Sequence, residues 1–265
     1  MKKNSPKSDG VVRNPVPKQK PRLLFVGEGP QDVGREEYPG GAAAGFLQAA
    51  LMGPGNPVEA EGLAFVIAAM RQWTMLPVPS PKTKKRSFGD LMSLNTEGDR
   101  VRAALVLART QGLDGVFVLK DCEQQGRFDL QDTLRHAREV FEANDPMTSR
   151  PRLVVATPSR AHETWLLADP NAVISVFGPK GVYAFSKSPE SRPPSEKLKS
   201  HITSHSDRCH LNPAESRRRL AYGASPKTLS SQCPKCYPTF LKDVDDELRP
   251  LTEDLAVAIV ECADG

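Results

Sequence analysis

Two short apolar segments, each followed at once by acidic residues, constrain the fold of this chain more than any other feature. Residues 23–26 (Leu-Leu-Phe-Val) lead into Gly27-Glu28-Gly29, and residues 116–119 (Val-Phe-Val-Leu) lead into Lys120-Asp121-Cys122-Glu123. Both segments are apolar on every side, which is typical of strands buried inside a parallel sheet. Residues 153–156 (Leu-Val-Val-Ala) predict a further strand of this kind.

Segments with helical character separate these predicted strands. Residues 100–110 and 129–143 carry apolar side chains at helical spacing, and residues 63–73 have the length and composition of a helix. Another strand is expected at residues 75–78, just before two prolines. The alternation predicts an α/β fold, with a doubly wound parallel sheet covered by helices on both faces.

The chain divides into three predicted regions. Residues 1–21 are rich in proline and basic residues and predict a disordered basic tail. Residues 22–170 form the α/β domain, with an irregular Gly- and Ala-rich stretch at 40–62 and a helix at 160–168 that Ser159 caps. The mainly helical region 171–265 follows, with an exposed loop at 178–200 and helices at 212–221, 240–248 and 251–262.

The composition predicts a soluble, cytoplasmic protein. Of the 265 residues, 38% are hydrophobic and 26% are charged, a profile typical of globular domains. No apolar segment approaches the ~20 residues that a transmembrane helix needs, so no membrane association is expected.

Five unevenly spaced cysteines do not suggest a disulfide framework. Cys233 and Cys236, with Cys209, His205 and His210 nearby, leave a zinc site open as an alternative.

The positive charge of the chain lies mainly in its N-terminal tail. The net charge is +4, but residues 1–22 hold seven Lys or Arg against one Asp, which leaves a slightly acidic body. Nucleic acid would therefore be attracted by the tail or by local basic patches such as Lys84, Lys85 and Arg86. The alternative for the tail is a solubilising leader without a binding role.

Acidic residues directly after strands predict a metal centre. Asp121 and Glu123 are two positions apart, so in extended geometry both side chains point to the same side. Because ligands of α/β sheets bind beyond the carboxyl ends of the strands, Glu28 can converge with them on one site. Such hard oxygen ligands suit Mg²⁺ or Mn²⁺. The alternative is that these are unrelated surface acids.

The glycines around Glu28 do not favour a dinucleotide-binding turn. Gly27, Gly29 and Gly34 surround a carboxylate that would repel a pyrophosphate. Pro30 also removes one of the backbone donors on which such a turn depends. Acid–base or metal chemistry fits this turn better.

In order and spacing, these motifs resemble the Toprim family, in which a strand ends in Glu-Gly-x-x-Asp and a later strand ends in Asp-x-Asp. Residues 161–169 (Ala-His-Glu-Thr-Trp-Leu-Leu-Ala-Asp) are similar to a Glu-x-Trp-Leu-Leu-x-Asp segment of an uncharacterised bacterial Toprim-like branch, related to nucleases of the overcoming-lysogenization-defect type. The resemblance covers residues 22–170. One departure is Glu123, which stands where the family usually has aspartate.

The resemblance implies a role for each acidic residue. Glu28 would be the general acid or base and a metal ligand, and Asp121 and Glu123 would hold the metal. Asp32 and Glu163 would help to bind a first or second metal. Lys120 lies beside Asp121 and would contact phosphate, although an ordinary surface lysine is the alternative.

The function that follows is metal-dependent hydrolysis of DNA or RNA. Relatives of this type often act beside an ATPase in bacterial antiphage systems, so a separate ATPase subunit is an expected partner. One alternative is a Toprim-like module that binds nucleic acid or a partner without cutting it. Another is a hydrolase or transferase acting on small phosphorylated molecules. The sequence leaves the oligomeric state open, a homo-oligomer included.

Overall fold

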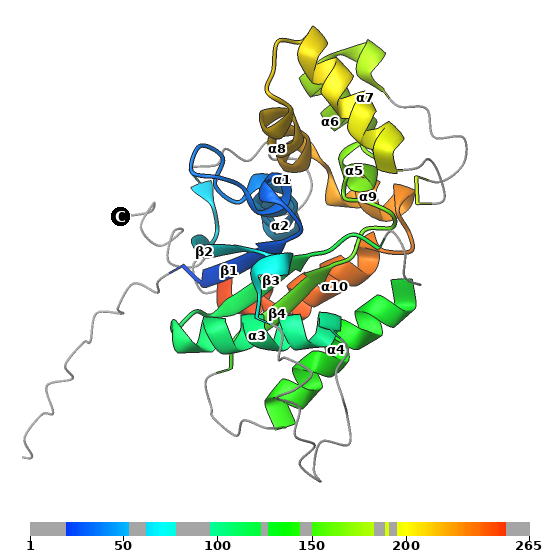
Figure 1. Cartoon of the computed structure of the whole chain (residues 1–265). Helices are drawn as coiled ribbons and strands as arrows, with labels where there is room; N and C mark the ends of the chain where they lie inside the picture. The colour runs from blue at the N-terminus through cyan, green and yellow to red at the C-terminus, as the bar shows by residue number, and fades with distance from the viewer. Residues whose placement is uncertain are drawn as a thin grey trace, which may run out of the picture.

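Four parallel strands form the central sheet of this chain, in the order β2-β1-β3-β4 (Figure 1). The computed structural model describes residues 20–52, 62–77, 96–122, 127–143, 150–182, 189–190 and 195–252. The strands β1 (Arg22–Gly27), β3 (Gly115–Leu119) and β4 (Arg152–Ala156) confirm three of the predicted strands. The predicted α/β class with a parallel sheet is therefore confirmed.

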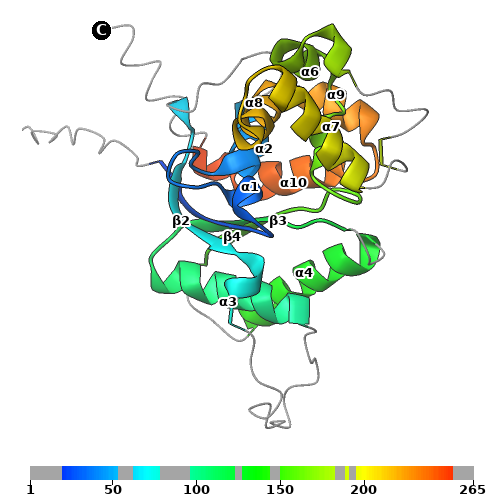
Figure 2. The same cartoon turned by 45° about the horizontal axis from the view of Figure 1, so that its top comes forward.

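Alternate side chains of each strand enter two separate cores, one on each face of the sheet. Phe25 and Phe117 belong to the first core, and their neighbours Val26 and Val118 belong to the second. Helices α2 (Gly41–Met52) and α10 (Tyr237–Glu247) pack into the first core. Helices α3 (Thr96–Thr110) and α4 (Arg127–Ala143) cover the opposite face (Figure 2). Burial on both faces explains why the central strands are apolar throughout.

The described part of the chain after residue 170 is helical. Its elements are α6 (Pro170–Phe177), η3 (Pro179–Gly181), α7 (Ser195–Arg208), α8 (Pro213–Gly223), α9 (Pro226–Gln232) and α10. Leu198, Leu220 and Phe240 from these helices share one core with Phe25 and Phe117 of the sheet. The C-terminal helices therefore pack directly on the side of the sheet that carries α2.

The second strand of the chain lies earlier than predicted. Residues 66–72 form β2 (Val66–Gln72), where a helix was expected, and the expected strand at 75–78 begins in a 3₁₀ turn, η2 (Trp73–Met75). β2 is an edge strand that pairs with β1 alone and is partly exposed along its length. An edge position tolerates the Ala-rich, partly polar sequence that resembles a helix, because pairing rather than propensity decides the structure.

The Gly- and Ala-rich stretch is more regular than predicted, because residues 41–52 form helix α2. Nearly all of its side chains are buried between the sheet and α8, so it shows no polar face from which a helix could be predicted. At Gly45 the two helices approach so closely that an added Cβ would lie 2.6 Å from the Cβ of Ala221.

Replacing Gly45 with alanine is expected to destabilise the protein by ~1–3 kcal/mol, because overpacking must push α8 away from α2. The free energy of unfolding in urea measures this effect. Gly223→Ala is the matched control, since an added Cβ there meets Ala172 Cβ at an ordinary 3.5 Å. Equal stability of the two variants would contradict the close packing of these helices.

The helix predicted at 160–168 is much shorter. Helix α5 comprises Glu163–Leu166, and its N-terminal cap is His162, not Ser159. Arg160 adopts a positive φ of 69°, which interrupts any helix before it starts. Ser159 contributes in another way, since its carbonyl oxygen accepts hydrogen bonds from the Ala161 N–H and the Thr164 hydroxyl.

Several sequence predictions fall outside the described residues. These are most of the basic tail, the patch of Lys84, Lys85 and Arg86, the acid Glu123, and the helix expected at 251–262 beyond its first two residues. Within the described ranges, no helix combines the length and the apolar composition that crossing a membrane requires.

Candidate functional site

The turn after β1 brings an aspartate against the carboxyl end of the sheet. Helix α1 (Pro30–Val33) begins two residues after Glu28, and its Asp32 accepts a hydrogen bond from the Gly29 N–H through Oδ2 at 2.9 Å. An added Cβ at Gly27 would lie only 2.6 Å from the Cβ of Asp32. Glycine at position 27 therefore allows Asp32 to lie this close to the strand end.

The segment after β3 is held to the start of α5. The Oδ1 atom of Asp121 accepts a hydrogen bond from the backbone N–H of His162 at 2.8 Å. The Cys122 N–H donates to the Pro158 carbonyl oxygen at 3.2 Å. These bonds place the carboxylate that follows β3 beside the residues that follow β4.

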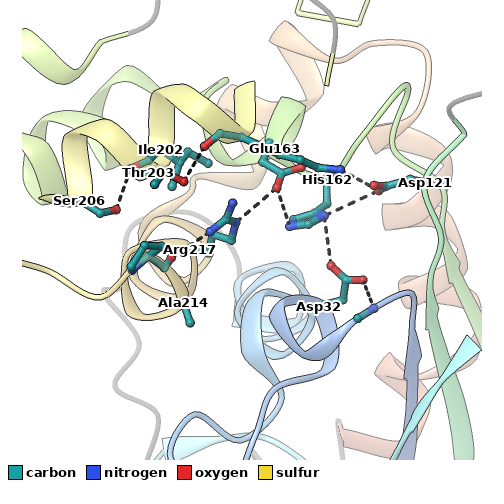
Figure 3. Close-up of polar contacts among 12 residues, drawn as sticks. Asp32, Asp121, His162, Glu163, Ile202, Thr203, Ser206, Ala214 and Arg217 are labelled. Carbon is teal, nitrogen blue, oxygen red and sulfur yellow. Dashed lines mark hydrogen bonds and ion pairs between the residues drawn. The ribbon is translucent and has the colours of Figure 1, made fainter. Parts of the chain in front are cut away.

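The imidazole of His162 lies among three carboxylates (Figure 3). Its Nδ1 atom is 3.2 Å from Asp32 Oδ1 and 3.7 Å from Asp121 Oδ1, and its Nε2 atom is 3.6 Å from Glu163 Oε1. All four residues are buried, and Glu163 is completely inaccessible. Three segments distant in sequence thus converge in one desolvated cluster, which we call the acidic centre (Asp32, Asp121, His162 and Glu163).

Arg217 connects the acidic centre to the C-terminal helices. From α8, its Nε lies 3.3 Å from Glu163 Oε1, and its Nη1 donates to the carbonyl oxygen of Pro213 at 3.3 Å. The guanidinium is nearly as buried as the carboxylate that it contacts. A buried charge is costly unless it is paired, so this contact fixes both α8 and the Glu163 side chain.

Burial and mutual charges shift the titration of the acidic centre. Burial alone would lower the pKa of His162, but Glu163, Asp32 and Asp121 outweigh it and raise the pKa to about 10. Burial raises the pKa of Asp121 despite the neighbouring His162. Burial alone would raise the pKa of Glu163, but His162 and Arg217 together lower this pKa below its usual range. In metal-free protein the imidazole is therefore a cation among carboxylates.

A pH dependence of stability follows from the raised pKa of His162. Its stabilising contribution in metal-free protein is complete below pH 6.5, the ordinary pKa of histidine, and is lost as the pH rises through about 10. Between these two pH values, the free energy of unfolding is expected to fall by up to ~1.4 kcal/mol per pH unit. Urea unfolding with a chelator measures it, and His162→Gln is expected to flatten the slope. An unchanged slope in the variant would contradict this assignment.

Glu28 and Lys120 form an ion pair at the exposed border of the acidic centre. The side chain of Glu28 is 40% exposed, whereas that of Lys120 is 15% exposed. Both residues are close in sequence to members of the acidic centre. Lys120 directly precedes Asp121, and Glu28 lies just before α1, which contains Asp32. This pair is the part of the site that a substrate in solution can reach.

The acidic centre could hold a metal ion. Ligand atoms of Asp121, His162 and Glu163 all lie within 4.8 Å of one another. Both ring nitrogens of His162 and the Oε2 atom of Glu163 are buried and make no hydrogen bond with the described part of the chain. Unsatisfied buried donors and acceptors point to a missing partner. Two carboxylates with one imidazole are ligand types that divalent cations use in proteins.

The structure brings together only some of the residues named from the sequence. Asp32, Asp121 and Glu163 lie in the acidic centre, and Glu28 and Lys120 lie at its border. Sequence reasoning missed His162 and Arg217 as members of the site. His162 could have been noticed beside Glu163 in the Toprim-like segment, but nothing in the sequence connects Arg217 to it.

The zinc alternative has no ligand set in the described residues. Cys233 and Cys236 are buried free thiols, and the Sγ of Cys236 donates a hydrogen bond to Glu190. Among the described His, Cys, Asp and Glu side chains, the metal-binding geometry is met by the acidic centre and not by these cysteines. Both cysteines are buried in the first core, next to the start of α10.

Comparisons with known proteins do not extend these observations, since no protein-family model, curated protein or solved structure matches this chain. The Toprim resemblance thus remains a prediction from short motifs.

Proposed function

We propose that this chain is a divalent-metal-dependent phosphodiesterase that cleaves nucleic acid at the carboxyl ends of β1 and β3. The convergence of Asp32, Asp121, His162 and Glu163 in one buried cluster carries this proposal. Buried clusters of ionisable groups with shifted pKa values gather at functional sites, which makes this cluster the best candidate in the described part of the chain. The Glu28–Lys120 pair adds a reachable base and a cation at its border.

Asp121, His162 and Glu163 would hold the ion, and Mn²⁺ is our choice of ion for the tests. A divalent cation at this position supplies charge stabilisation for the oxygens of a phosphodiester. Arg217 keeps Glu163 in its orientation, as outer partners of metal ligands commonly do. Asp32 adds negative charge that favours a cation over a neutral ligand in this cluster.

Residues of the chain divide the remaining tasks of hydrolysis. Glu28 is exposed enough to accept the proton of an attacking water. Lys120 binds a phosphate oxygen once it leaves its ion pair with Glu28, because a nearby phosphate competes for the same ammonium group. Substrate binding would therefore free the Glu28 carboxylate at the moment when a base is needed.

Cleavage assays test this proposal directly. Purified protein is incubated with supercoiled plasmid, single-stranded DNA or total tRNA in the presence of Mn²⁺, Mg²⁺ or a chelator. We expect cleavage of at least one polymer with Mn²⁺ or Mg²⁺, and none with the chelator. Cleavage that persists in the chelator would exclude the proposed mechanism.

Glu28→Gln is expected to lower the cleavage rate by ~10²–10⁴-fold, the usual contribution of a general acid or base. Manganese binding should persist, because the Glu28 side chain lies outside the ligand group. Rates are compared with those of Glu36→Gln, which changes an exposed acid in the nearby loop. Equal rates for the two variants would remove Glu28 from the mechanism.

A second candidate function is a nucleic-acid-binding module without catalysis. Its supporting observation is that His162 and Arg217 already neutralise most of the buried negative charge. In that case the cluster connects the sheet to α5 and α8, and no metal is needed. Binding of nucleic acid without metal-dependent cleavage would favour this function.

A further inference from the structure

A shallow groove lies beside the acidic centre, at the carboxyl ends of β1 and β2. Its volume of about 430 Å³ lies within the ~300–1,000 Å³ range of small-molecule sites. Two segments line it, the turn around α1 and the end of β2 with η2. The lining residues are Pro30, Val33, Gly34, Arg35, Met70, Arg71, Gln72 and Met75.

The register of the sheet places this groove next to the proposed catalytic residues. Arg71 pairs with Val26 and Gln72 pairs with Gly27, the residue immediately before Glu28. The four-residue helix α1 borders the groove through Pro30 and carries Asp32 of the acidic centre. A strand of nucleic acid with one phosphate at Glu28 could therefore reach this groove.

The walls of the groove combine apolar surface with cationic groups. Met75 is 68% exposed, an unusual degree for a large apolar side chain, and Met70 and Pro30 extend the same surface. The flexible thioether of methionine packs favourably against aromatic rings. An aromatic ligand, such as a nucleobase, fits these walls.

Arg35 and Arg71 provide the cationic groups. Both side chains are exposed, and neither forms an ion pair with any carboxylate in the described ranges. Arg71 donates to the carbonyl oxygen of Met70 at 2.7 Å, which holds its guanidinium at the groove. An arginine without an acidic partner is available for phosphate, which it binds through paired N–H groups.

We propose that this groove binds one unstacked nucleotide of the substrate strand, next to the phosphodiester that is cleaved. Met70 and Met75 contact the base, and Arg35 and Arg71 contact the flanking phosphates. The inference rests on the proposed function for the position of the cleaved bond. It adds a preference for single-stranded nucleic acid, because a base must leave its helix to enter the groove.

Fluorescence anisotropy of a labelled single-stranded oligodeoxynucleotide tests this inference, with a chelator present to prevent cleavage. The double variant Arg35→Gln, Arg71→Gln is expected to bind at least ~10-fold more weakly than wild type and to reduce the salt dependence of log K by ~1–2. Arg102→Gln, an exposed arginine of α3 on the opposite face of the sheet, should bind like wild type.

Met75→Ala separates the base contact from the phosphate contacts. It should weaken binding without altering the salt dependence, and the loss should disappear for duplex DNA of the same sequence. Circular dichroism verifies that each variant is folded. Light scattering tests whether a second copy of this chain occupies the groove instead. A dimer mass for wild type that falls to the monomer mass in Met75→Lys would assign the groove to this contact and overturn the inference.

The outcomes distinguish this inference from the proposed function. If wild type and the double arginine variant bind the oligonucleotide with equal affinity, the groove is not the nucleotide site, even if cleavage depends on metal. No binding by wild type at low salt overturns it as well. If the double variant loses binding but wild type cleaves nothing with any metal, the groove is the nucleotide site and the proposed nuclease activity is rejected.

Discussion

Asp121→Asn is expected to abolish manganese binding and, with it, cleavage of nucleic acid. Asn keeps the size of the side chain and the acceptor for the His162 N–H, so the fold should persist. It removes one negative charge from a group of three ligands whose atoms lie within 4.8 Å of one another. Loss of an outer partner already costs ~10–100-fold in metal affinity, and loss of a direct ligand should cost more.

Isothermal titration with Mn²⁺ measures this effect, and the cleavage assay follows it. Asp207→Asn is a suitable control, because Asp207 is an exposed acid of α7 outside the acidic centre. The thermal midpoint of metal-free Asp121→Asn should equal or exceed that of wild type, since burial raises the pKa of this aspartate and its charge is costly. Undiminished manganese affinity in Asp121→Asn would refute its role as a ligand.

Arg217→Met should have the largest effect on stability, a loss of ~3–5 kcal/mol, because it breaks a buried ion pair by removing one partner. Methionine fills much of the same volume but leaves Glu163, which is fully buried, without its guanidinium. The helices α5 and α8 also lose their charged connection. Unfolding in urea, with a chelator present, measures the change.

Arg219→Met is the matched control on the same helix. Arg219 is 53% exposed and pairs with Glu215 four residues earlier, a contact of the kind worth at most ~1 kcal/mol. If Arg217→Met were as stable as Arg219→Met, the charge of Glu163 would not depend on Arg217. The pair would then be incidental to the acidic centre.

The sequence predicts three of the four strands well because burial on both faces demands apolar residues. β1, β3 and β4 were predicted to within one residue at every end, whereas β2 was interpreted as a helix. Its partly exposed side chains leave no continuous apolar pattern, whereas β4, which is also an edge strand, is buried after its first residue. Helix α2 was missed for the opposite reason, because a helix buried on all sides has no amphipathic periodicity.

The acidic residues of the site were predictable from two sources, the strand ends and the resemblance to a family. Asp121 could be identified from the strand before it, and Asp32 and Glu163 from the resemblance to a family. The role of His162 depends on a hydrogen bond from its backbone to Asp121, 41 residues away. Arg217 is 54 residues from Glu163, and only the packing of α8 on the sheet side brings them together.

Pulsed electron paramagnetic resonance of the manganese-loaded protein tests the central claim most directly, because it detects nitrogen atoms bound to the ion. The acidic centre predicts one bound Mn²⁺ per chain with a ¹⁴N signal from the His162 imidazole. In His162→Gln that nitrogen signal should disappear. A bound manganese with no nitrogen coupling, or no bound manganese at all, would contradict a metal site built from Asp121, His162 and Glu163.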